Sequence, residues 1–186
     1  MSRRNNVSRA DNQQERLAGL LEGWIVGFTD VEGCFSVGFV RQKDRKEKNR
    51  TRRGYKTGYQ AFHEFAVTQG ESSLSTLKEF KRFFKVGKIY INKRYDNHNE
   101  HLYRYVVRNR NDLLTVIIPF FKKKKLRSAK RANFEKFVRC VRLIARGVHL
   151  KKKGLLRIAK ITQHMNRKKS GKNLARILRD HTPNSA

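Results

Sequence analysis

The chain has 186 residues, of which 45 are Lys or Arg and 15 are Asp or Glu, so its formal charge is +30. Its length suits one compact domain, or one with an appendage, and its 38% of hydrophobic residues permit a folded core. A charge this high excludes an ordinary metabolic enzyme surface and indicates a polyanionic partner.

The N-terminal part of the chain predicts a helix followed by two strands. Apolar residues recur at helical spacing over residues 17–28, with Asp11 or Asn12 as a cap and Gly33 as the end of the helix. Residues 35–40 and 61–67 alternate between apolar and small or polar side chains, as β-strands do. Between them, residues 41–56 hold nine Lys/Arg against two acidic residues, which predicts a solvated loop.

The remainder predicts a second set of elements. A short helix is expected over residues 74–84, strands over 87–92 and 102–108, a helix from Asp112 to Pro119, and a long helix over 129–148. Alternating strand pairs and helices indicate an α+β fold, in which helices cover one face of an antiparallel sheet and leave the other open. We expect a core domain at residues 1–150 and a basic helical C-terminal extension at 151–186.

Three glycines lie on one face of the first helix. Gly19, Gly23 and Gly27 are spaced by four residues, although each costs about 1 kcal/mol relative to alanine inside a helix. A stripe without side chains lets another helix approach closely. Because the chain has one such helix, we expect two copies of the chain to pair about a two-fold axis. The alternative is that the glycines accommodate a neighbouring element of the same chain.

Two carboxylates lie at the end of this helix. Asp30 and Glu32 are repelled by the negative end of the helix dipole and by each other. In a two-fold pair their duplicates would crowd together as well, which is unfavourable unless a hard divalent cation lies between them. Such a cation near phosphates can support phosphodiester hydrolysis. The alternative is local capping.

Residues 25–33, Ile-Val-Gly-Phe-Thr-Asp-Val-Glu-Gly, resemble the motif of the LAGLIDADG homing endonucleases, with Gly27, Asp30, Glu32 and Gly33 in the motif's places. Phe65-Ala-Val-Thr-Gln69 and Pro119-Phe-Phe-Lys-Lys-Lys-Lys125 resemble two further segments of that family. With a single motif, the chain resembles the homodimeric type. The resemblance implies an αββαββα fold, with a saddle-shaped antiparallel sheet, helices on one face and a helical C-terminal extension.

The resemblance also implies roles for individual residues. Glu32 and the backbone carbonyl of Val31 would bind a divalent cation, Mg²⁺. Gln69 would help to order water and phosphate, and Lys124 would lie near the scissile phosphate. The structural residues would be Gly27, Asp30 and Gly33 of the motif, together with Gly19 and Gly23 of the glycine stripe.

The open face of the sheet is suited to the major groove of DNA, which admits a two-stranded β-ribbon. Period-two counting places these residues on that face: Ser36, Gly38, Val40, Gln42, Gln60, Phe62, Glu64, Lys88, Tyr90, Asn92, Arg94 and Arg104. Lys122, the earlier lysine of the lysine run, is also expected to contact DNA. Residues 41–56 and the basic tail would bind phosphates without selecting bases.

The leading hypothesis is a homodimeric, Mg²⁺-dependent endonuclease that cuts both strands of double-stranded DNA at a long, roughly palindromic target, as in intron homing. Two alternatives stay open: an RNA-binding intron maturase on the same fold, and a catalytically silent DNA-binding regulator. Cys34 and Cys140 form no Cys-x-x-Cys pair, and no apolar run suggests a signal peptide or a membrane span. The expected location is inside the cell, in an organelle or the prokaryotic cytoplasm.

Overall fold

The computed structural model describes residues 4–42, 44–48, 50–93, 100–165, 176–177 and 179–180. Its first element, α1 (Arg4–Glu32), is a helix of 29 residues. The helix begins upstream of the expected caps, so Asp11 and Asn12 lie inside it and the prediction of its start was wrong. Residues 4–16 contain neither Pro nor Gly, and nothing in them interrupts a helix. The helix ends as predicted at Gly33, where a Cβ would lie only 2.7 Å from the Thr29 carbonyl oxygen.

A four-stranded antiparallel sheet forms the middle of the fold. Its strands are β1 (Gly33–Arg41), β4 (Tyr59–Gly70), β6 (Leu102–Val107) and β5 (Lys88–Asn92), in the spatial order β1-β4-β6-β5. The register pairs Ser36 with Glu64, Thr68 with Arg104, and Arg104 with Tyr90. Even-numbered residues of all four strands therefore share one face of the sheet.

The odd-numbered residues face the helices and build the core. Phe35, Phe65 and Tyr105 are fully or almost fully buried, and Phe35 and Phe65 stack with their ring centroids 5.0 Å apart. Helix α2 (Leu74–Phe84) adds Phe80 and Phe84 to this core. Helices thus cover one face of the sheet, and the expected α+β fold is confirmed.

The segment before the lysine run differs from the prediction. A helix was expected to stop near Pro119, but α3 (Arg110–Asp112) continues through a π-helical turn (Leu113–Ile117) into α4 (Ile118–Lys123). A proline inside a regular α-helix lacks an N–H donor and clashes with the preceding turn. Here Pro119 occupies the first turn of α4, and the wider π turn precedes it, so the chain stays helical.

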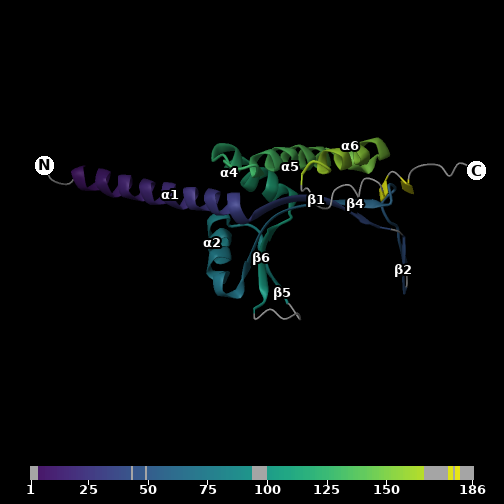
Figure 1. The fold of residues 1–186 in the computed structure, drawn as a ribbon, viewed down its shortest axis with the longest axis horizontal. Helices are drawn as coiled ribbons and strands as arrows, with labels where there is room; N and C mark the ends of the chain where they lie inside the picture. The colour runs from purple at the N-terminus through teal and green to yellow at the C-terminus, as the bar shows by residue number, and fades with distance from the viewer. Residues whose placement is uncertain are drawn as a thin grey trace, which may run out of the picture.

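The remaining helices form the layer above the sheet in Figure 1. They are α5 (Lys130–Ala145) and α6 (Lys152–Thr162), joined through a 3₁₀ turn (Val148–Leu150). Leu155, Ile158 and Ala159 of α6 join the same core as the sheet. The division at residue 150 stays a prediction.

The basic loop contains strands that the sequence did not predict. Strands β2 (Arg45–Glu47) and β3 (Arg50–Arg52) pair as a separate hairpin. Its tip and the far end of the β5–β6 pair both project to the side of the sheet away from α4–α6 (Figure 1). No helix among the described residues is long and apolar enough to span a membrane.

Candidate active site and nucleic-acid interface

Asp30 fixes the loop that precedes α5. Its carboxylate accepts hydrogen bonds from the Arg127 amide at 2.6 Å, the Ser128 amide at 3.2 Å and the Ser128 hydroxyl at 2.7 Å. Burial raises the pKa of Asp30, but the hydrogen bonds from Ser128 and Arg127 and the charge of Lys130 outweigh burial and lower it. These contacts occupy the Asp30 carboxylate, so this side chain ties α1 to α5.

Glu32 and Val31 are exposed at the end of α1. Among the described residues, the Glu32 carboxylate has no hydrogen-bond or ion-pair partner. The side chain of Val31 points to solvent, and its carbonyl oxygen accepts a hydrogen bond from Lys130 Nζ at 2.8 Å. A carbonyl oxygen has two lone pairs, so the Val31 carbonyl can accept the hydrogen bond from Lys130 and still offer its second lone pair to another partner.

Lys130 is a site residue that the sequence prediction missed. Burial lowers the pKa of Lys130, and the charges of the nearby Cys34, Asp30 and Glu32 partly offset that shift. The Lys130 ammonium group therefore interacts with both carboxylates at the end of α1. The resemblance points to the lysine run 122–125, and Lys130 follows that run in the same basic stretch. No sequence pattern says which lysine reaches the end of α1, because the hydrogen bonds of Asp30 set the path of residues 127–130.

The structure does not bring Lys124 to Glu32. Lys124 Nζ forms an ion pair with Glu22 Oε2 at 2.6 Å. Glu22 lies ten residues before Glu32, about 15 Å along the helix axis. Gln69, by contrast, lies two residues beyond the pair formed by Gly33 and Val67, so the strand register carries it to the α1–β1 junction. The roles expected of Lys124 and Gln69 stay predictions.

The glycine face of α1 has no partner within the described residues. Apart from the neighbouring backbone of α1 itself, a Cβ built at Gly19, Gly23 or Gly27 would meet no atom of the described residues within 4 Å. These glycines and residues 123–127 line a groove of about 940 Å³, which also holds Glu22 and Asp30. Beside the glycines, the apolar side chains of Leu17 and Leu20 are 59% and 70% exposed. No described element therefore packs closely enough against these glycines to explain them.

The end of α1 offers two oxygen donors to a hard divalent cation. No group of three or more His, Cys, Asp or Glu side chains that could hold a metal occurs among the described residues. The exposed Glu32 carboxylate and the Val31 carbonyl are oxygen donors. Mg²⁺ typically takes one or two carboxylates and fills its remaining positions with water and substrate phosphates. The residues present fit that mode of binding, in which the protein supplies few ligands.

The expected DNA-contact residues of the strands share one face of the sheet. The strand register gives this face Ser36, Gly38, Val40, Gln60, Phe62, Glu64, Lys88, Tyr90, Asn92 and Arg104. Gln42 follows the end of β1, and its side-chain Nε2 donates a hydrogen bond to Gln60 Oε1 at 2.8 Å. Gly38 is buried against the Phe62 ring and presents no side chain. Arg94 lies outside the described residues, and Lys122 lies on α4, on the helical side of the sheet.

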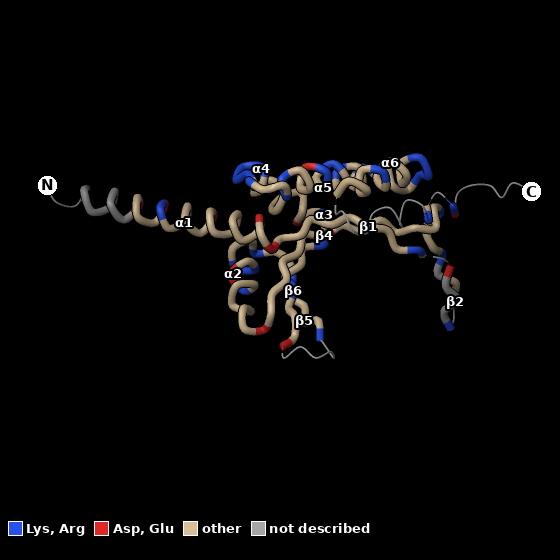
Figure 2. Tube along the Cα trace, in the orientation of Figure 1, with Lys and Arg blue, Asp and Glu red and all other residues tan. Residues whose placement is uncertain are grey.

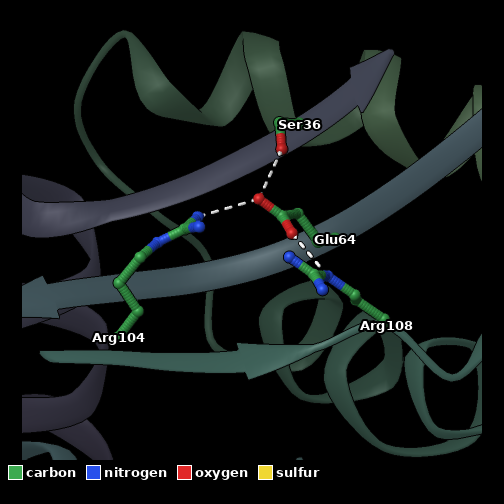
Figure 3. A network of polar contacts seen from close by, with 4 residues as sticks. All are labelled: Ser36, Glu64, Arg104 and Arg108. Atoms are coloured by element: carbon green, nitrogen blue, oxygen red, sulfur yellow. Dashed lines mark hydrogen bonds and ion pairs between the residues drawn. The ribbon is translucent and has the colours of Figure 1, made fainter. Parts of the chain in front are cut away.

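Glu64 anchors two arginines on this face, as Figure 3 shows. Its carboxylate accepts from Arg104 Nη2 and from Arg108 Nε, each at 2.8 Å, and from the Ser36 hydroxyl at 3.5 Å. Burial raises the pKa of Glu64, but the hydrogen bonds from Arg108 and Arg104 outweigh burial and lower it. Arg108 also lies 5.7 Å from the centre of the Tyr90 ring. The sequence prediction omitted Arg108, although the strand expected over residues 102–108 included it at the same parity as Arg104; in the structure β6 ends one residue before it.

Comparisons with known proteins agree with this architecture. The homing endonuclease I-TnaI has a crystal structure that is 33% identical to this chain, with a TM-score of 0.69, and the match covers 86% of this chain and 96% of I-TnaI. I-SmaMI bound to its uncleaved DNA target in the presence of calcium ions is 29% identical, with a TM-score of 0.65, and the match covers 83% of this chain and 47% of I-SmaMI.

A probable intron-encoded endonuclease of Neurospora crassa is 27% identical over 74% of this chain. The chain spans between 26% and 50% of the length of the curated relatives that it matches. The family model described as LAGLIDADG endonuclease matches residues 25–141, which is more than half of the chain. The chain therefore belongs to the LAGLIDADG endonuclease family.

Proposed function

We propose that two copies of this chain pair through the glycine faces of α1 and cut both strands of a long, roughly palindromic DNA target. The observation that carries this proposal is a glycine-lined helix that has no partner among the described residues and ends in an exposed Glu32. The comparisons add support. The part of this chain that matches covers 96% of I-TnaI but only 47% of I-SmaMI, so two copies of that part would span most of one I-SmaMI chain.

The proposed chemistry is metal-dependent phosphodiester hydrolysis. Glu32 and the Val31 carbonyl would hold Mg²⁺, which when bound polarises a phosphoryl oxygen and lowers the pKa of a coordinated water. Lys130 Nζ, held beside the Val31 carbonyl, would stabilise negative charge on the reacting phosphate. Gln69, at the α1–β1 junction, would orient the attacking water.

The proposed reading surface is the open face of the sheet. Side chains from four strands reach this face, and the β2–β3 and β5–β6 ends project beside it (Figure 1). Polar and charged residues there, such as Gln60, Lys88 and Arg104, can pair with base edges in the major groove. The nine Lys/Arg of residues 41–56 would contact phosphates and make binding strongly dependent on salt.

A randomised duplex library tests this function. The purified protein is incubated with the library in Mg²⁺ or in EDTA, and the cut ends are sequenced. We expect cleavage at one long motif with two-fold symmetry, only with Mg²⁺, and none with Glu32→Gln. Glu135→Gln is the matched control, because it removes the same charge from an exposed position on α5. Cutting by Glu32→Gln at the wild-type rate would refute the proposed role of this carboxylate.

One surface favours a second candidate function, RNA binding as an intron maturase. A groove of about 460 Å³ between α5 and α6 is lined by Arg139, Lys153, Arg157 and Lys160, with Leu156 and Ile161. Lys and Arg gather along α4–α6 in Figure 2, on the side away from the β5–β6 end. Gel-shift competition between a structured RNA and a duplex DNA tests this candidate. RNA that fails to bind while DNA occupies the sheet would exclude a separate RNA surface.

A further inference from the structure

The described C-terminal residues return to the far end of the sheet. Ile177 is fully buried in the same core as the strands. The Arg176 guanidinium lies 5.4 Å from the centre of the Tyr59 ring and donates to the Phe39 carbonyl oxygen at 3.2 Å. An arginine over an aromatic face, with a hydrogen bond to the backbone, is held more firmly than a solvated surface arginine.

Asp180 completes this contact. Its carboxylate accepts a hydrogen bond from the Tyr59 hydroxyl and lies 3.6 Å from Arg41 Nη2. Burial raises the pKa of Tyr59, and the hydrogen bond and charge of Asp180 raise it further, so the phenol stays a hydrogen-bond donor at neutral pH. We call residues 176–177 and 179–180 the C-terminal clasp.

The C-terminal clasp contacts both ends of the segment that joins β1 to β4. Phe39 and Arg41 are at the end of β1, and Tyr59 begins β4. The chain between them carries the β2–β3 hairpin and the nine Lys/Arg of residues 41–56. β2 and β3 pair only with each other in the described structure. A two-stranded hairpin is marginally stable alone, so its direction depends on how its base is held.

We propose that the C-terminal clasp is a positioning device, which holds the base of the β2–β3 hairpin so that its basic residues reach the outer parts of the bound DNA. This inference rests on the proposed DNA binding by the open face of the sheet. Arg176 and Asp180 act through Tyr59, Phe39 and Arg41, not by touching DNA. They would therefore decide how far the contacts with the target extend from its centre.

The test compares full-length variants of equal charge. Arg176→Gln breaks the clasp, whereas Arg146→Gln removes the same charge from an exposed position that follows α5 and lies outside the clasp. The probe is a duplex selected by the wild-type protein from a randomised library, mapped by hydroxyl-radical footprinting at several salt concentrations. We expect Arg176→Gln to lose protection at both outer ends, to bind about tenfold more weakly, and to show a shallower salt slope, because phosphate contacts are lost. Arg146→Gln should keep the wild-type footprint.

A second measurement needs no DNA. Limited trypsin digestion should cut within residues 41–56 faster in Arg176→Gln and in Asp180→Asn than in the wild type. If wild-type protein selects no duplex but the variants show faster digestion, the DNA proposal fails and the structural role of the clasp stands. Wild-type digestion rates in both variants, or a footprint weakened evenly along the whole target, would overturn the inference.

Discussion

Replacing Glu64 by Gln tests whether this carboxylate anchors arginines or contacts DNA itself. The substitution keeps the shape of the side chain and removes its charge. Glu64 is 7% exposed, and the side chains of its partners Arg104 and Arg108 are 33% and 59% exposed. A shielded charged hydrogen bond contributes about 1.5–3 kcal/mol, while an exposed ion pair contributes about 0.2–1 kcal/mol.

These magnitudes predict a measurable loss of stability. Gln can still accept one hydrogen bond, so we expect Glu64→Gln to lower the free energy of unfolding by about 1–2 kcal/mol. For a chain of this size, each kcal/mol lowers Tm by about 2–4 °C. The released arginines and the added positive charge should also strengthen binding to unrelated DNA and reduce the ratio of specific to non-specific affinity by about tenfold.

The assay combines thermal melting with competition binding between the selected duplex and a scrambled one. Glu135→Gln carries the same charge change on an exposed part of α5 and controls for charge alone. If Glu64 contacted DNA directly, its loss would relax one base position, such as a preference for cytosine, without lowering Tm. That result, or unchanged stability and selectivity, would refute the anchoring role.

Three further predictions address the active site, the pairing face and the core. Lys130→Met should slow cleavage about 100-fold with little loss of DNA binding, whereas Lys124→Met should slow it far less; equal losses in single-turnover assays would contradict the assignment of Lys130. Gly23→Leu should leave the monomer folded by circular dichroism, because no described atom lies within 4 Å of a Cβ there, but should abolish pairing in sedimentation experiments; a paired variant would count against the glycine interface. Burial, then the charges of Arg110 and His149, lower the pKa of His63 to about 4 from 6.5, so the unfolded chain binds this proton first as pH falls, and stability is intact above about pH 6.5 and lost toward pH 4. His63→Leu should remove that part of the acid sensitivity in urea melts at several pH values, and an unchanged pH dependence would exclude His63 as its source.

The fold could be predicted from periodicity, because the buried apolar residues recur at every second position in the strands and at helical spacing in the helices. The expected strands match β1, β4, β5 and β6, since Phe35, Phe65 and Tyr105 occupy the buried side of each pleat. The same alternation put the proposed DNA-contact residues of the strands on one face. The polar N-terminal turns of α1 have no apolar stripe, so only the structure shows where this helix begins.

Other features depend on contacts that a sequence pattern does not encode. The β2–β3 hairpin has no apolar alternation, and its base is held by residues far away in the chain. The helix passes Pro119 because of a π turn, which has no distinctive sequence. Lys130 reaches Val31 because Asp30 binds the amides of Arg127 and Ser128, a contact between segments 97 and 98 residues apart. Tertiary hydrogen bonds, and not local propensity, determine which lysine reaches the end of α1.

We propose that each of two paired chains contributes one Glu32 to the cutting of one DNA strand. The most direct measurement uses mixed pairs, in which a tagged wild-type chain is purified together with a differently tagged Glu32→Gln chain and added with Mg²⁺ to a supercoiled plasmid that carries the selected target. We predict that the mixed pair nicks the plasmid to the open circle and does not linearise it. Linear plasmid formed at the wild-type rate, or the failure of the two tagged chains to co-purify on DNA, would contradict the claim.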